Sequence, residues 1–241
     1  MNKKTIMIVI AIIVGVIGFL VLTQPKEEAA GTPSEHKVGA GTAGVTLVEY
    51  GDFQCPGCGS YYPILKQVKE YYGDKITFQF RHFPLETMHK NARAAARAAE
   101  AAGLQGKFWE MHNKIYENQA QWENASNPVS IFEGYADSIG LNKEKFAMDY
   151  KSSEVSATIS ADLKAGRELG VDSTPTFFLN GQKLEPNPSG FEQFKEKIDA
   201  KIVELSKNSG DNQEKPEQKQ SENTDAQKQK ETNTNNEPTG Q

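Results

Sequence analysis

Cysteine is nearly absent from this sequence: of 241 residues, only Cys55 and Cys58 carry a thiol, in the stretch "FQCPGC" at 53–58. Histidine is almost as scarce, and the four residues are His36, His82, His89 and His112. Structural zinc takes four ligands, and a lone CxxC supplies two. The histidines show no ligand spacing, so we expect no metal. There is no basic stripe either, and the net charge of −5 argues against a nucleic-acid partner.

Charge is missing from "IMIVIAIIVGVIGFLVL" at 6–22. With Thr5 and Thr23 this run would span about 28 Å as a helix, close to the ~30 Å core of a bilayer. It is longer than the apolar core of a signal peptide, which favours an uncleaved anchor in residues 1–23 over a cleaved signal. Lys3 and Lys4 precede the run, so the positive-inside rule predicts a cytoplasmic N-terminus and an extracytoplasmic remainder.

Residues 207–241 lack aromatic and branched aliphatic side chains. Such a segment cannot bury enough apolar surface to offset its ordering entropy, so we predict a disordered tail. Residues 24–44, rich in Ala, Gly, Thr, Glu and Pro, are predicted to be a flexible tether. Between them, residues 45–206 have the length of one domain.

The pattern of this domain is mixed. "VTLVEYGDF" (45–53) and "KITFQFRHF" (75–83) are typical of strands, with a helix starting at the cysteines between them. Residues 84–170 are predicted to be an inserted helical block. "TPTFFLNGQKLE" (174–185) then predicts a hairpin around Asn180-Gly181, followed by an amphipathic helix from about Ser189 to Leu205. This order predicts an α/β fold with one mixed central sheet.

The cysteine pair has three possible roles. Zinc binding is disfavoured by the ligand count. A structural disulfide is also disfavoured, because a loop of two residues constrains the unfolded chain very little. Redox chemistry suits the spacing, because positions i and i+3 lie on one helix face, where two sulfurs can form or open a disulfide.

The start of the helix favours a reactive thiol. If Cys55 is the N-cap, Pro56 occupies the first helical position, where its missing N–H has no cost. The Cys55 sulfur then faces the free N–H groups of the first turn and the positive end of the helix dipole, which favour thiolate over thiol. We expect Cys55 to be the exposed nucleophile and Cys58 to resolve the mixed disulfide.

The CPGC motif at a strand–helix junction, the "TPTFFLNG" hairpin, "RHFPL" (81–85) and "GKFWEMHNKIYENQ" (106–119) resemble the DsbA-like branch of thioredoxin-fold proteins. The resemblance covers about residues 45–205. It implies a thioredoxin-like fold with a helical insertion, and a cis proline at Pro175 against the cysteines. The backbone of Thr174 would pair with an incoming substrate strand, beside Pro56 and Gly57 in the motif.

Glu49 is a charged residue within the apolar strand "VTLVEY". Burial of an unpaired carboxylate is costly, so its pKa should rise. The resemblance implies that a buried acid six residues before the first cysteine exchanges protons with Cys58. An edge-exposed or lysine-paired glutamate is the alternative. His82 and His89 are interpreted as structural, and Trp109, Met111 and Trp122 as packing residues.

Gly57 departs from the strongly oxidising members of the family, which place histidine there, so we expect a weaker oxidant. The apolar run predicts an anchored enzyme, and the lack of an obvious dimerisation domain favours a monomer. The resemblance implies that it donates disulfides to exported proteins that contain cysteines. It would need a membrane redox partner for reoxidation and no cofactor beyond the Cys55–Cys58 disulfide. A reductase or isomerase on the same fold, and a surface-anchored binding module without activity, are the alternatives.

Overall fold

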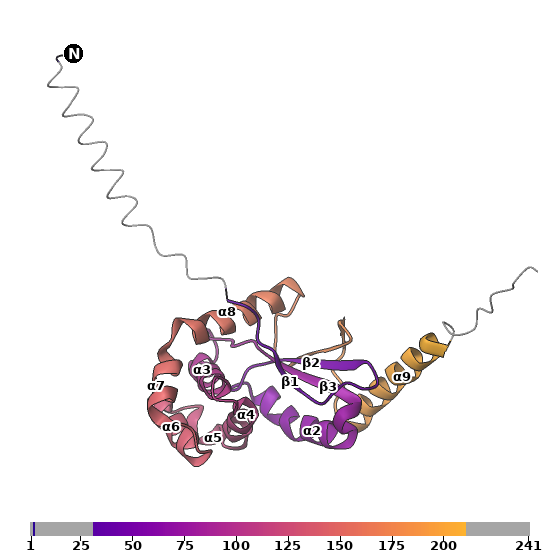
Figure 1. Ribbon diagram of the computed structural model, residues 1–241, viewed down its shortest axis with the longest axis horizontal. Helices are drawn as coiled ribbons and strands as arrows, with labels where there is room; N and C mark the ends of the chain where they lie inside the picture. The colour runs from indigo at the N-terminus through magenta and orange to yellow at the C-terminus, as the bar shows by residue number, and fades with distance from the viewer. Residues whose placement is uncertain (1, 3–30, 211–241) are drawn as a thin grey trace, which may run out of the picture.

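The computed structural model describes residue 2 and residues 31–210 (Figure 1). Its centre is a five-stranded sheet in the order β1-β3-β2-β4-β5. β2 and β3 are parallel, and each of the other neighbouring pairs is antiparallel, so the predicted mixed sheet is confirmed. The strands are β1 (His36–Val38), β2 (Val45–Gly51), β3 (Ile76–His82), β4 (Thr176–Leu179) and β5 (Gln182–Lys183).

The helices follow the predicted order. α2 and a 3-10 turn connect β2 to β3, six helices follow between β3 and β4, and the last helix follows β5. Their bounds are α2 (Pro56–Tyr72), η1 (Gly73–Lys75), α3 (Ala92–Gly103), α4 (Phe108–Glu117), α5 (Gln119–Trp122), α6 (Pro128–Ser138), α7 (Lys143–Lys151), α8 (Ser153–Glu168) and α9 (Phe191–Gly210). The helical insertion at 84–170 therefore lies where the sequence predicts it.

Alternation along β2 supplies apolar side chains to both faces of the sheet. Leu47 belongs to the larger core, which also includes residues of α2, α9 and the insertion. Tyr50 faces a smaller cluster with Phe83, Val171 and Phe178, on the side where Gly166 of α8 packs closely against Tyr50 and Phe83. A Cβ on Gly166 would lie 2.8 Å from the Phe83 ring, so this close approach requires glycine.

The β4–β5 turn contains Asn180 and Gly181, as predicted. Both have positive φ, 47° and 80°, which is the conformation that this two-residue turn requires. The Asn180 side chain also accepts a hydrogen bond from the N–H of Thr46, at 2.7 Å, which ties the turn to β2.

Two predicted boundaries are wrong. The segment 24–44 is not a tether throughout, because His36–Val38 form an edge strand antiparallel to β3. Backbone pairing, with little apolar burial, holds this strand, so no hydrophobic pattern marks it. The last helix ends at Gly210, beyond the predicted domain end at 206.

Within residues 31–210, no helix combines the length and the apolar character that a membrane span needs. The predicted anchor at 5–23 and most of the predicted tail, 211–241, lie outside the described residues.

Candidate active site

The cysteine pair lies at the junction of β2 and α2. Cys55 is the N-cap of α2 and Pro56 is its first residue, as predicted. Both cysteines are free thiols. Cys58 is fully buried, and Cys55 is the more accessible of the two but exposes only 8% of its surface. The expected exposed nucleophile is therefore a largely covered sulfur.

The environment of Cys55 favours its thiolate. A hydrogen bond from the Cys58 thiol lowers the pKa of Cys55 to about 5, against an opposing effect of burial. The Thr174 side chain and the backbone N–H groups of Cys58 and Gly57 lower the pKa of Cys55 further. Burial raises the pKa of Cys58 well above its ordinary value, and the Cys55 and Glu49 charges act in the same direction. The two thiols thus have opposite tendencies, as an attacking and a resolving cysteine require.

Thr174 and Pro175 close one side of the pair. The Thr174–Pro175 peptide bond is cis, as the resemblance implied. The Cys55 thiol donates to the Thr174 carbonyl at 3.3 Å. A Cβ on Gly57 would lie 3.3 Å from Pro175 Cδ and 3.5 Å from Cys55 Sγ, so Gly57, Cys55 and the cis proline are in immediate proximity. Pro56 is exposed beside them.

Glu49 lies in the core beneath the pair. Glu49 is 2% exposed, and its Oε1 has no hydrogen-bond partner among the described residues. Burial raises the pKa of Glu49 to about 8, with a smaller opposing effect of the Lys69 charge. A carboxyl with this pKa is mostly protonated at neutral pH and can supply a proton there.

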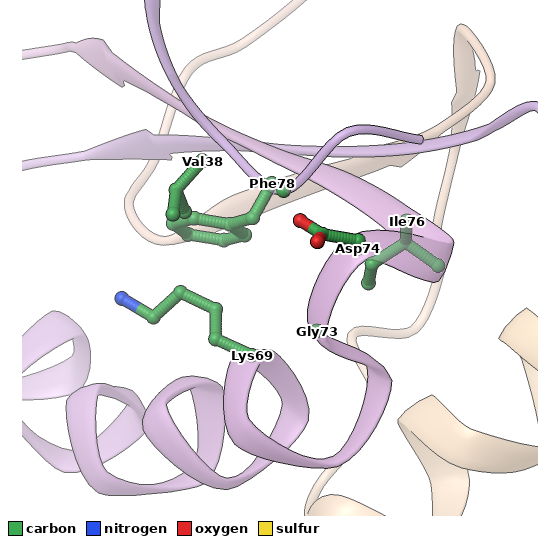
Figure 2. A pocket seen from close by; sticks show the side chains of 7 residues that line it. Val38, Lys69, Gly73, Asp74, Ile76 and Phe78 are labelled. Carbon is green, nitrogen blue, oxygen red and sulfur yellow. The ribbon is translucent and has the colours of Figure 1, made fainter. Parts of the chain in front are cut away.

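Lys69, which sequence analysis did not single out, is the cation that acts on Glu49. Its Nζ lies 4.8 Å from the centre of the Phe78 ring and 5.0 Å from that of Trp109, as a cation–π contact. Figure 2 shows the Lys69 side chain extended along the Phe78 ring, in a cavity of about 120 Å³ that Asp74 also lines. Nothing in the sequence distinguishes this lysine from Lys66, the exposed lysine of the same helix.

Asp52, three residues before Cys55, was also missed. This buried carboxylate accepts hydrogen bonds from the N–H groups of Gln54 and Leu85, both at 2.8 Å, and from His89 Nδ1 at 2.7 Å. Its own N–H donates to Cys58 Sγ at 3.5 Å. His89 was interpreted as structural, and it reaches the turn that carries the cysteines. The sequence signal that could have identified Asp52 is an acidic residue within "GDFQC", the stretch that ends at the first cysteine.

One cluster within residues 31–210 has ligand atoms close enough to hold a metal ion: His36, His82 and Glu100. The spacing of the histidines in the sequence does not reveal this cluster, because His36 lies in β1, which pairs with β3, and not in a tether. The expectation that the protein binds no metal stays a prediction. In this structure, Nε2 of His36 and Nε2 of His82 lie 2.6 and 2.7 Å from the same Glu100 oxygen. These are hydrogen-bond distances. Burial raises the pKa of Glu100, but the two histidines outweigh it and lower the pKa to about 2.

Solved structures share this fold. BdbD from Bacillus subtilis, in its oxidised form, is similar with a TM-score of 0.61 and 23% identity, over 72% of this chain and 97% of that chain. The α-DsbA1 protein of Wolbachia pipientis is similar with a TM-score of 0.65 and 20% identity, over 76% and 98% of the two chains. The DsbA-like fold expected from the sequence is therefore confirmed.

Curated relatives are closer in sequence. The Na(+)/H(+) antiporter NhaA 1 of Mycolicibacterium gilvum (strain PYR-GCK) is 39% identical over 151 residues, which are 62% of this chain and 24% of that protein. The Na(+)/H(+) antiporter NhaA 1 of Salinispora arenicola (strain CNS-205) is 35% identical over 169 residues, 70% of this chain and 24% of that protein. The chain spans about a quarter of the length of these relatives.

The fold and the cysteine pair define a protein of thioredoxin-like fold with two free thiols at the start of α2. Within that class, a family model described as Thioredoxin matches residues 31–200, and the chain belongs to this family. The match begins before β1, in agreement with the corrected domain boundary.

Proposed function

We propose that this protein exchanges disulfides with exported proteins that contain cysteines, through Cys55 and Cys58, and that it acts mainly as a disulfide donor. The observation that carries the proposal is a cysteine with a pKa of about 5 at a helix N-cap, against a cis proline. A stabilised thiolate favours the reduced form of the pair, and this preference makes its disulfide oxidising.

The proposed reaction uses the oxidised pair. A substrate thiolate attacks Cys55 Sγ, the Cys55–Cys58 bond breaks, and Cys58 leaves with the electron pair. Glu49 supplies the proton that neutralises the Cys58 sulfur. A second substrate thiolate then attacks the substrate sulfur of the mixed disulfide, and Cys55 leaves as a thiolate. The substrate has lost two electrons, and the pair has gained them.

The roles of the other residues follow from their places in this reaction. Thr174, next to the cis Pro175, offers its backbone to the substrate strand, and Pro56 and Gly57 form the surface that the strand crosses. Reoxidation requires a partner that takes two electrons from the pair, and we assign this step to a membrane protein. No organic cofactor or metal takes part in the proposed reaction.

An extracytoplasmic, membrane-attached location belongs to the proposal. The apolar run at 5–23 supports it. So does the similarity to part of proteins named as Na(+)/H(+) antiporters. A reductase or isomerase is the second candidate, and Gly57 between the cysteines favours it because glycine adds no side-chain donor or charge near the thiolate.

The test is refolding of a reduced, cysteine-containing substrate protein by the oxidised enzyme, with insulin reduction as the reverse assay. We expect Cys55→Ser to abolish both activities. Cys58→Ser should accumulate a mixed disulfide that gel electrophoresis without reductant detects. Activity of Cys55→Ser equal to that of the unmodified protein would refute the proposal.

A further inference from the structure

The turn that carries Cys55 is held from outside by the helical insertion. The Gln119 side chain, at the start of α5, donates from Nε2 to the carbonyl of Phe53 at 2.7 Å and to the carbonyl of Cys55 at 3.1 Å. One amide group therefore joins both ends of the three-residue segment that leads from β2 into α2. Gln119 is 66 residues from Phe53 in the chain, so this contact exists only because of the fold.

A second contact reinforces the same junction. The Gln54 side chain donates to the carbonyl of Glu123, just after α5, at 2.7 Å. Its Oε1 accepts the N–H of Asn91, also at 2.7 Å. The segment 53–55 thus makes hydrogen bonds to the insertion through its backbone and through its one polar side chain.

The position of Gln119 depends on a glycine in α2. A Cβ on Gly59 would lie 2.5 Å from Gln119 Oε1 and 3.1 Å from its Cδ. Gly59 does not need its conformational freedom here, since it lies within a regular helix. What the position requires is the absence of a side chain, so that the Gln119 amide can reach the two carbonyls.

The contact acts on the charge of Cys55. The Cys55 carbonyl already accepts the N–H of Gly59 at 3.0 Å, and Gln119 adds a second donor to it. These donors offset the partial negative charge of the Cys55 carbonyl oxygen, which belongs to the same residue as the sulfur. They also fix the turn so that the N–H groups of Gly57 and Cys58 approach Sγ. A thiolate benefits from both effects more than a disulfide sulfur does, because only the thiolate carries a charge.

We propose that Gln119 is a positioning residue of the exchange reaction, by which the helical insertion stabilises the Cys55 thiolate and so makes the disulfide more oxidising. The inference rests on the proposed function for its biological meaning. Its physical content concerns the thiol alone and can be measured without a substrate.

The experiment compares Gln119→Leu with Gln121→Leu in the full chain. Gln121 is a matched control, because it is exposed in the same helix and its side chain bonds to Asn118 and Tyr135 within the insertion. Thiolate absorbance at 240 nm, followed against pH, gives the pKa of Cys55. We expect Gln119→Leu to raise this pKa by about half a unit to one unit, the usual scale of one hydrogen bond, and Gln121→Leu to leave it unchanged.

The free energies of unfolding of the oxidised and reduced forms show whether Gln119 positions the thiolate or only supports the fold. Gln119→Leu should destabilise the reduced form more than the oxidised form, and the potential of the pair against glutathione should become more negative to match. Equal destabilisation of both forms, or an unchanged pKa, would overturn the inference.

Gly59→Ala reaches the same contact from the other side. It should raise the Cys55 pKa in the same direction, and the double variant with Gln119→Leu should show less than the sum of the two shifts. Additive shifts would contradict a shared mechanism. If the unmodified protein neither refolds substrates nor reduces insulin, the proposed function fails, while the pKa comparison still decides the role of Gln119.

Discussion

Glu49→Gln tests the buried acid most directly, because it keeps the shape of the side chain and removes its titration. The structure gives this carboxyl a pKa of about 8 in the folded protein, compared with 4.5 for an ordinary glutamate. Since the folded pKa is the higher of the two, the folded state binds the proton more tightly. Stability is therefore lost as the pH rises from about 4.5 through about 8.

The size of this loss follows from the two pKa values. Relative to a permanently neutral side chain, Glu49 should cost roughly 1 to 2 kcal/mol at pH 5.5 and roughly 4 to 5 kcal/mol at pH 8.5. The difference, about 3 kcal/mol, is a large fraction of the stability of a domain of this size. Glu49→Gln should lack this pH dependence, and the variant should gain on the parent by that amount between the two pH values.

Urea unfolding of the oxidised proteins at pH 5.5, 7.0 and 8.5 measures the effect, because in the oxidised form neither sulfur titrates. Burial, the largest cause of the raised pKa, is retained in this form. The rate of disulfide exchange by Glu49→Gln is a second measurement. Loss of the proton donor should slow the step in which Cys58 leaves by about a hundredfold, the usual scale of general acid catalysis. Parallel pH profiles for Glu49→Gln and the parent would refute the reasoning.

Three further predictions concern the thiol, the motif and the core. The Cys55 thiolate should titrate with a midpoint near pH 5 when followed by absorbance at 240 nm. Because this folded pKa is depressed, the stabilisation of the reduced form should be lost as the pH falls through that value. A midpoint near 9 would contradict the site geometry. The reduction potential of the pair, measured in a glutathione equilibrium, should lie below about −120 mV. Gly57→His should raise this potential, and its Cβ, 3.3 Å from Pro175 Cδ, requires that atom to move by only a few tenths of an ångström. A lower potential in Gly57→His would count against the argument. Asp162→Ala should lower the free energy of unfolding in urea by about 3 kcal/mol or more. The reason is that the buried Asp162 carboxylate accepts hydrogen bonds from Arg81 and from the N–H groups of Ser34 and His82. A loss below about 1 kcal/mol would show that these contacts are weak.

Sequence analysis predicts those features of the fold that carry a local pattern. The β2–α2–β3 unit, the Asn180-Gly181 turn and the insertion each have one: apolar β-branched runs, a turn dipeptide, or helical periodicity. β1 has none of these. It is three residues long and lies at the sheet edge, and only Val38 among its residues is apolar, yet that side chain is exposed. Its pairing with β3 is a tertiary event, and the local composition of Gly, Ala and Thr favoured a tether.

The site divides in the same way. Cys55, Cys58 and Glu49 stand out because their residue types are unusual where they occur, whether as a CxxC pair or as a charge within an apolar strand. Lys69 and Gln119 are ordinary residues on helices that each carry a second residue of the same type, Lys66 and Gln121. Their importance comes from the groups that they reach, the Glu49 carboxyl and the turn carbonyls, and these lie 20 and more residues away.

The same distinction explains how a short motif can be tuned without being changed. Within "CPGC" only Pro56 and Gly57 can vary, and Gly57 has no side chain to place near the sulfur. The remaining influences on the Cys55 thiolate come from outside the motif: the Thr174 side chain beside the cis peptide bond, and Gln119 from the insertion. Two proteins with the same four residues can then differ in potential, because the insertion supplies different donors to the turn. Substitution at Gln119 should therefore shift the potential while the motif stays intact, and substitution at the solvent-facing Gln121 should not.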